Sequence, residues 1–267
     1  MFKNISARGL NIWEVLILTF FYVLLKFLLV IGLFDIIENS IEDPFLQIEF
    51  GEFISAFITV LLLILLFKRY FSVKENNYIS YPNWKLLFLL VILVIGLRFI
   101  EDPFFRYKNI LFNEPNINPD EIKSIGFSTD IVFKFIYTIL LVPVFEELLF
   151  RKIIFKSLLI KYSNLWLAIL ISSILFSATH LSLRNAIPTL LFGITAAYIY
   201  YKTNNIWYPI SFHILSNLLW FAIFINPKNY WILLEELNFN IGYWLVVIFG
   251  IGLIYLIIKQ YQRLKVN

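Results

Sequence analysis

Residues 12–34 read IWEVLILTFFYVLLKFLLVIGLF, a stretch in which only Glu14 and Lys26 carry a charge. A helix needs about 20 mostly apolar residues to cross the hydrocarbon core of a bilayer, so this stretch predicts a transmembrane helix. No small-residue cleavage site follows it, which favours a retained helix over a cleaved signal. We interpret Glu14 and Lys26 as snorkelling or paired side chains and assign them no chemistry.

The composition extends this interpretation to the whole chain. Of its 267 residues, 60% are hydrophobic, 19% aromatic and 15% charged, whereas soluble domains are about 45–50% apolar and about 25% charged. A soluble enzyme, a nucleic-acid-binding domain and a disordered protein are therefore excluded. The net charge of +4 is too small to indicate a polyanionic partner, and the lack of cysteine excludes disulfides and thiol chemistry. The sequence predicts an integral membrane protein.

Eight apolar stretches are long enough, or nearly so, to span a bilayer. They are residues 12–34, 52–67, 85–100, 129–150, 164–181, 185–202, 206–225 and 241–258. We therefore predict an all-α fold, a polytopic membrane bundle of about eight transmembrane helices. The fourth helix should continue towards residue 161, because no glycine or proline follows Pro143 in this stretch.

The distribution of charges predicts the orientation. With the N-terminus in the cytoplasm, most of the 22 lysines and arginines fall on the inner side, while acidic residues cluster after the first span. Both termini are then cytoplasmic, and residues 101–128 form an outer loop. The absence of a targeting signal and the compact size favour a prokaryotic plasma (inner) membrane. The pentapeptide at residues 41–45 recurs at residues 100–104, which we interpret as coincidence or a shared cap-and-turn role rather than a duplicated helix pair.

Ionisable groups inside a bilayer are costly unless they are paired or hydrated, so each is a candidate functional residue. Glu147 and Arg151 are four residues apart and share one helical face, whereas Glu146 points about 100° away. The simplest interpretation is that Arg151 neutralises Glu147 and leaves Glu146 facing the bundle interior. The alternative is that both acids form salt bridges to a neighbouring helix.

A second polar pair occurs near the end of the chain. His213 and Asn217 are also four residues apart, so their side chains can reach the same point. Two hydrogen-bond donors that converge in a dry site can stabilise a developing oxyanion. The alternative is that both residues join helices by hydrogen bonds, as polar side chains in membranes often do.

The spacing of these residues predicts that they meet at one depth. The chain should reverse at residues 162–164, and Glu146 precedes Ser163 by as many residues as His180 follows it. In an antiparallel hairpin, Glu146 and His180 would then be level. His213 should lie within a turn or two of that depth. Pro143, three residues before Glu146, removes one helix hydrogen bond and could kink the span so that water reaches Glu146, and the alternative is an ordinary proline of a membrane helix.

These residues resemble the three motifs of the CPBP family, the CAAX-processing and bacteriocin-processing intramembrane proteases. The first motif is Glu146-Glu147-Leu148-Leu149-Phe150-Arg151, the second is Phe176-Ser177-Ala178-Thr179-His180, and the third is His213-Ile214-Leu215-Ser216-Asn217. The resemblance predicts three regions, which are an N-terminal three-span region (1–128), a catalytic core (129–225), and a C-terminal span with a basic tail (226–267).

In that family the first glutamate and the second-motif histidine activate water, and the third motif forms the oxyanion site. The resemblance therefore implies that Glu146 is the general base, that His180 assists it, and that His213 and Asn217 stabilise the tetrahedral intermediate. Glu147 and Arg151 would be supporting residues.

The family is often labelled metallopeptidase, yet the sequence lacks the HExxH arrangement of zinc proteases. Glu146, His180 and His213 could still supply three zinc ligands and leave one position open. Asn217 is a poor zinc ligand but a good oxyanion donor. We therefore favour a mechanism without metal or cofactor and retain zinc as the alternative.

The resulting hypothesis is an intramembrane endopeptidase acting on a membrane-associated substrate, either a prenylated CAAX-type or a leader-bearing peptide or a membrane protein. Its partners would be that substrate and the lipid bilayer, with no nucleic acid. One alternative is a non-catalytic bacteriocin-immunity or membrane scaffold protein on the same fold. Another is a transporter or proton relay, which would also place acids and histidines at depth.

Overall fold

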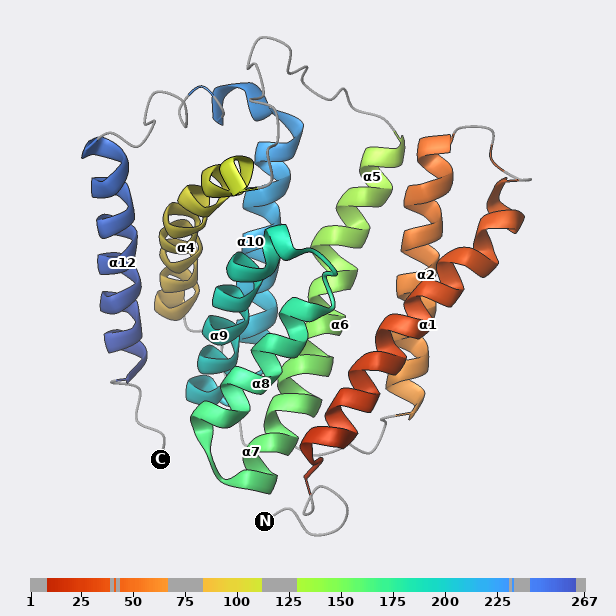
Figure 1. Cartoon of the computed structure of the whole chain (residues 1–267), viewed down its shortest axis with the longest axis horizontal. Coiled ribbons are helices and arrows are strands. Elements are labelled where there is room, and N and C mark those ends of the chain that lie inside the picture. Colours follow the sequence, from red (N-terminus) through yellow and green to blue (C-terminus); the bar gives the residue numbers. More distant parts are fainter. Residues whose placement is uncertain are drawn as a thin grey trace. The chain divides into compact units, whose positions relative to one another are not determined.

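The computed structural model describes residues 9–38, 41, 44–66, 84–111, 129–230, 232 and 241–262. All regular structure in these ranges is helical, and no strand occurs among the described residues (Figure 1). Two helical stretches, Ile12–Leu33 and Trp207–Ile225, are long and apolar enough to cross a membrane by themselves. Large apolar side chains such as Phe20, Phe88 and Phe249 are more than half exposed, as lipid-facing residues would be. The fold is an all-α membrane helix bundle, as predicted.

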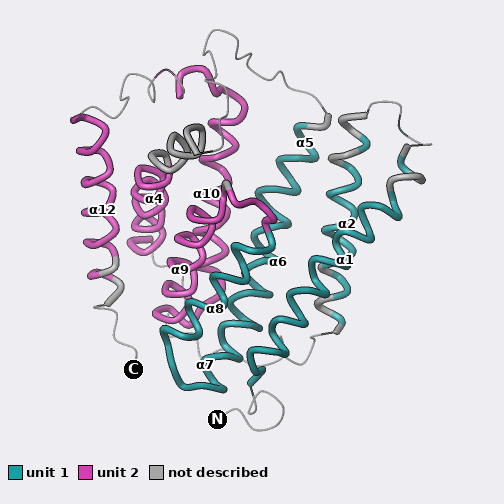
Figure 2. Tube along the Cα trace, viewed as in Figure 1, with its two compact units in different colours: residues 1–76, 127–179 teal, residues 77–126, 180–267 magenta. Residues whose placement is uncertain are grey.

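The chain divides into two compact units, each of which combines an early and a late part of the sequence (Figure 2). Unit 1 comprises residues 1–76 and 127–179, and unit 2 comprises residues 77–126 and 180–267. The two units are described separately below.

Unit 1 is built on the long fourth span and the helices that pack along it. Its elements are α1 (Ile12–Glu38), α2 (Pro44–Leu66), α5 (Thr129–Phe135), η2 (Ile136–Leu141), α6 (Val142–Glu147), η3 (Leu148–Phe155), α7 (Lys156–Tyr162) and α8 (Leu165–Ala178). Helix α1 packs on α2, α2 packs on α5 and η2, and α8 packs on η3 and α7. The segments from α5 to α7 follow one another without a break, so the prediction that the fourth helix continues towards residue 161 is confirmed.

The start of α1 is fixed by local hydrogen bonds. The Asn11 N–H donates to Glu14 Oε2 (2.7 Å) and the Glu14 N–H donates to Asn11 Oδ1 (2.9 Å), which is a reciprocal capping arrangement. Glu14 therefore caps the helix rather than snorkelling. The same end is held against α7, because the Ile12 N–H donates to the Tyr162 hydroxyl (3.2 Å).

The turn between α7 and α8 confirms the predicted reversal. Ser163 has a positive φ of 50° and ends α7. Asn164 then caps α8, its side chain accepting a hydrogen bond from the Leu167 N–H at 3.1 Å. Asparagine is among the preferred residues at this position because its oxygen satisfies an otherwise unpaired helix N–H.

Unit 2 is arranged around α4. Its elements are α4 (Trp84–Leu111), η4 (Leu183–Asn185), α9 (Ala186–Thr203), α10 (Trp207–Ile225) and α12 (Ile241–Gln262). Helix α4 packs on α9, α10 and α12. At the contact with α12, a Cβ on Gly250 would lie 2.8 Å from the Gly96 carbonyl oxygen, so glycine is required for this close approach. Small residues commonly allow membrane helices to approach in this way.

Each of the eight predicted spans corresponds to a helix, but some boundaries are wrong. Helix α2 begins at Pro44 rather than at residue 52, and α4 continues to Leu111. The first part of the predicted outer loop 101–128 is therefore helical, and the rest lies outside the described residues. The two copies of the pentapeptide occupy different positions, because Pro44 begins α2 whereas residues 100–104 lie inside α4, which fits coincidence rather than a shared cap-and-turn role.

Candidate active site

The fourth span departs from α-helical geometry on both sides of its two glutamates. The short α6 lies between the π-helical segments η2 and η3. The Val142 N–H donates to the Tyr137 carbonyl, and the Lys156 N–H donates to the Arg151 carbonyl, each five residues back. Pro143, which has no N–H to donate, is the second residue of α6 and follows the first π-helical segment after Val142. Such segments are frequent at functional sites, and here they flank Glu146.

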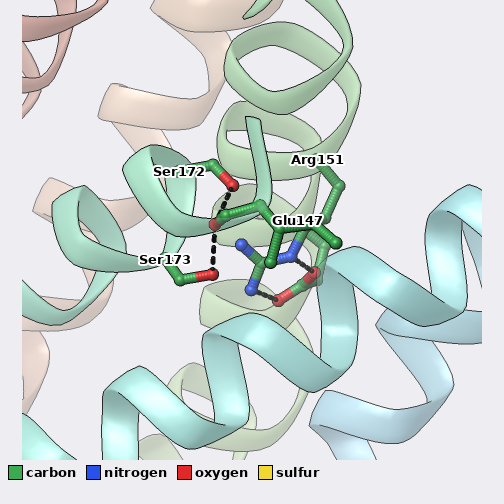
Figure 3. A network of polar contacts seen from close by, with 5 residues as sticks. Glu147, Arg151, Ser172 and Ser173 are labelled. Carbon is green, nitrogen blue, oxygen red and sulfur yellow. Dashed lines mark hydrogen bonds and ion pairs between the residues drawn. The ribbon is translucent and has the colours of Figure 1, made fainter. Parts of the chain in front are cut away.

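The predicted pair of Glu147 and Arg151 is confirmed. Arg151 Nε lies 2.8 Å from Glu147 Oε2, and both side chains are fully buried (Figure 3). A second contact joins Arg151 Nη2 to Glu147 Oε1 at 3.4 Å. A buried charge without a partner is strongly destabilising. Each of the two residues therefore offsets the cost of burying the other's charge in unit 1.

The second motif supports this ion pair from α8. The Arg151 guanidinium lies 5.0 Å from the centre of the Phe176 ring, within the range of cation–π attraction. The same ring meets Phe150 edge-on at 5.3 Å. Phe176 therefore joins the first and second motifs within unit 1.

Two buried serines of α8 form their hydrogen bonds within that helix. Figure 3 shows Ser172 and Ser173 beside the ion pair. Their hydroxyls donate to the Ile169 carbonyl at 3.1 and 2.7 Å, so these buried groups are satisfied within their own helix.

Glu146 is buried in α6, with 6% of its surface exposed. Tyr22 and Lys26 of α1 and Tyr137 of η2 all lie within electrostatic reach of its carboxylate. The sequence alone indicates no chemistry for Lys26. Its unusual position in the middle of the first apolar stretch was a visible signal, but the sequence does not show which acid it faces.

In unit 2, His213 and Asn217 lie one turn apart on α10. His213 is buried, and its ring packs against Phe192 of α9 with 4.6 Å between ring centres. Phe192 also stacks on Phe212 at 4.8 Å. The stacked phenylalanines thus limit the orientation of the imidazole. Phe192 lies outside the three motifs, and no sequence signal singled it out.

His180 occupies a different kind of position from the one predicted. Helix α8 ends at Ala178, not at residue 181, and His180 follows in an exposed turn. The Thr179 hydroxyl donates to the Phe176 carbonyl (2.7 Å), and Leu181 adopts a positive φ of 48°. Together these features end the helix before the histidine.

The six candidate residues are divided between the two units. Glu146, Glu147 and Arg151 belong to unit 1, whereas His180, His213 and Asn217 belong to unit 2. The structure confirms the Glu147–Arg151 pair in unit 1, and the convergence of His213 and Asn217 in unit 2 stays a prediction. Within the described residues of either unit, no three histidine, aspartate or glutamate side chains are grouped to hold a metal ion.

Comparison with known proteins gives one family match. Residues 128–219 match the family described as "Type II CAAX prenyl endopeptidase Rce1-like". Residues 128–219 therefore resemble an Rce1-like domain. The domain contains all three motifs, which confirms the resemblance to the CPBP proteases. It covers the helices from α5 to α9 and much of α10, whereas α1, α2, α4 and α12 lie outside it.

One curated relative was found for part of the chain. It is "Putative membrane peptidase YdiL" of Bacillus subtilis (strain 168), which is 38% identical over 89 residues. The match covers 33% of this chain and 36% of the relative, so it spans about a third of either protein. No solved structure matches the chain.

Proposed function

We propose that this protein is an intramembrane endopeptidase that hydrolyses a peptide bond in a membrane-associated substrate. One observation carries the proposal, namely that a single Rce1-like domain contains all three motifs, with the acid Glu146 and the imidazole of His213 both buried. The substrate would be a prenylated CAAX-type or leader-bearing peptide or a membrane protein. The membrane would be a prokaryotic plasma membrane.

The proposed reaction uses water as the nucleophile. Glu146, assisted by His180, accepts a proton from water as the oxygen attacks the carbonyl carbon. The carbonyl oxygen becomes an oxyanion, to which His213 and Asn217 donate hydrogen bonds. When the intermediate collapses, the C–N bond breaks and the proton held by Glu146 passes to the leaving amine.

Glu147 and Arg151 have a supporting role in this proposal. Their side chains satisfy one another at 2.8 Å in a fully buried position. Glu147 is the strongest partner of the guanidinium, and in the proposed mechanism the adjacent Glu146 acts on water. The ion pair would thus hold α6 in place without touching the substrate.

We propose that no metal or cofactor is required. Zinc is bound well by carboxylate and imidazole, so Glu146, His180 and His213 would be its ligands in the alternative mechanism, where zinc would polarise the scissile carbonyl. The third motif favours the metal-free mechanism, because an amide such as Asn217 is suited to donating a hydrogen bond to an oxyanion.

The proposal is tested by comparing the wild type with Glu146→Gln in detergent. Both are incubated with prenylated C-terminal peptides, leader-bearing peptides and single-span membrane proteins, and new termini are identified by mass spectrometry. We expect cleavage by the wild type and none by the folded variant. Glu14→Gln is the matched control, since glutamine also fits a capping box.

A non-catalytic bacteriocin-immunity or scaffold protein is the competing function. A wild type that cleaves no member of the panel would favour it. Cleavage that persists in Glu146→Gln would remove Glu146 from the role of general base.

A further inference from the structure

An ammonium group lies far inside the first span. Lys26 is 14 residues beyond the start of α1 at Ile12, which corresponds to about 21 Å along the helix. A charge at such a depth costs several kcal/mol unless it has partners. Lys26 has one in Tyr137, whose ring centre lies 5.8 Å from Nζ and whose side chain attracts the ammonium. The structure therefore holds this cation inside unit 1.

Two carboxylates attract the Lys26 ammonium, and one of them belongs to the candidate base, Glu146. The attraction from Glu146 is larger than that from Glu52 of α2. Arg151 also lies within reach of Glu146, but its strongest partner is Glu147. Two adjacent acids on α6 are thus matched by two cations, one from η3 and one from α1.

A small cavity, lined by both polar and apolar side chains, adjoins this group of charges. Its volume is about 10 Å³, and its lining includes Tyr22, Lys26, Thr59, Tyr137 and Phe145, the residue before Glu146. Thr59 is 2% exposed, and its hydroxyl has no hydrogen-bond partner among the described residues. A cavity of roughly 10–15 Å³ with two or more polar partners can hold one water molecule.

We propose that Lys26 is a positioning residue for Glu146. Its ammonium, held by Tyr137, offsets the charge of the Glu146 carboxylate, and together with Thr59 it binds one water in the cavity beside α6. The electrostatic part of this role stands on the contacts within unit 1. Its effect on catalysis rests on the proposed function of Glu146 as general base. A helix outside the Rce1-like domain would then contribute to the site.

The kinetic test uses two substitutions of similar length. Lys26→Met removes the charge and keeps an unbranched side chain, whereas Lys26→Arg keeps the charge. On a peptide that the wild type cleaves, we expect Lys26→Met to lower kcat by about tenfold or more with KM within about twofold, and Lys26→Arg to restore most of the rate. An unchanged kcat in folded Lys26→Met, or a rise in KM alone, would overturn the catalytic role.

A second test needs no substrate and therefore separates this inference from the proposed function. Midpoints of thermal unfolding are measured for Lys26→Met, Glu146→Gln and the double variant. If Lys26 and Glu146 interact, the fall in the unfolding midpoint of the double variant should be smaller than the sum of the falls in the two single variants. We expect the difference to be about 2 °C or more. The same comparison with Glu52→Gln in place of Glu146→Gln should show a smaller coupling to Lys26→Met. Additive losses with Glu146, or a larger coupling with Glu52, would overturn the pairing even if the wild type is an active protease.

Discussion

The Arg151 guanidinium is held between the Glu147 carboxylate, 2.8 Å from Nε, and the Phe176 ring, whose centre lies 5.0 Å away. This relationship joins the first sequence motif to the aromatic residue of the second. The two partners of Arg151 contribute differently. Glu147 supplies the opposite charge, and Phe176 supplies an aromatic face in a buried environment. Arginine suits both, because its planar group can pair with a carboxylate and stack on a ring.

Loss of the arginine should destabilise the fold. Arg151→Met leaves the buried Glu147 carboxylate without its principal cation, which we expect to cost about 3–5 kcal/mol. Removing both charges in Glu147→Gln/Arg151→Met should recover part of this loss. The check is thermal unfolding in detergent, and a double variant less stable than the single one would contradict the pairing.

The contribution of Phe176 should depend on the arginine. Phe176→Leu keeps an apolar side chain but removes the ring, which should cost about 2 kcal/mol through the lost cation–π contact, in addition to the change in packing. In an Arg151→Met background the same substitution should cost less, because the cation is absent. Equal losses in the two backgrounds would show that the ring acts only through packing.

The amide of the third motif should affect the chemical step. Asn217→Ala is expected to lower kcat by about 10²–10³-fold with little change in KM, since an oxyanion donor acts mainly in the transition state. Steady-state kinetics on a cleaved peptide provides the measurement. If KM rises while kcat is unchanged, Asn217 binds substrate instead.

Activity should survive the removal of metal ions. Under the proposed mechanism, dialysis against a zinc chelator leaves the rate of cleavage unchanged, and elemental analysis finds less than one zinc per active chain. Loss of activity that added zinc restores would favour the alternative in which Glu146, His180 and His213 are metal ligands.

Two glycines of α12 provide a matched pair for the packing of unit 2. A Cβ at Gly250 would lie 2.8 Å from the Gly96 carbonyl oxygen and 2.9 Å from Phe99 Cβ. Gly250→Ala should therefore lower the free energy of unfolding by about 1–3 kcal/mol. At Gly252 no atom lies within 4 Å of the added Cβ, so Gly252→Ala should be neutral or stabilising. Thermal unfolding of the two variants compares them directly.

Much of the fold could be predicted because membrane helices follow apolar length and end at recognisable residues. The reversal at Ser163 and Asn164 and the turn at Asn204, which also has a positive φ, lie where polar residues interrupt apolar stretches. The pairs on the fourth span and on α10 followed from helical spacing alone. These features depend on neighbours in the sequence.

The remaining features depend on contacts between distant residues. Pro103 lies inside α4 although a proline usually ends a helix, and hydropathy does not show where a helix continues past its apolar part. The exposed turn that carries His180 depends on backbone torsions after Thr179. The partner of Lys26 could not be predicted because Glu52 and Glu146 come from different helices.

The hydrogen bond between the Ile12 N–H and the Tyr162 hydroxyl joins residues that are 150 positions apart. At about 5–20 residues per second, a ribosome takes roughly 8–30 s to make the chain between them. During that interval α1 can pair with α2, its neighbour in the finished protein, but the Ile12 N–H lacks the Tyr162 hydroxyl as acceptor. The start of α1 thus gains this contact only after residue 162 has been made, so an early stage of biogenesis leaves this end open to insertion factors and proteases.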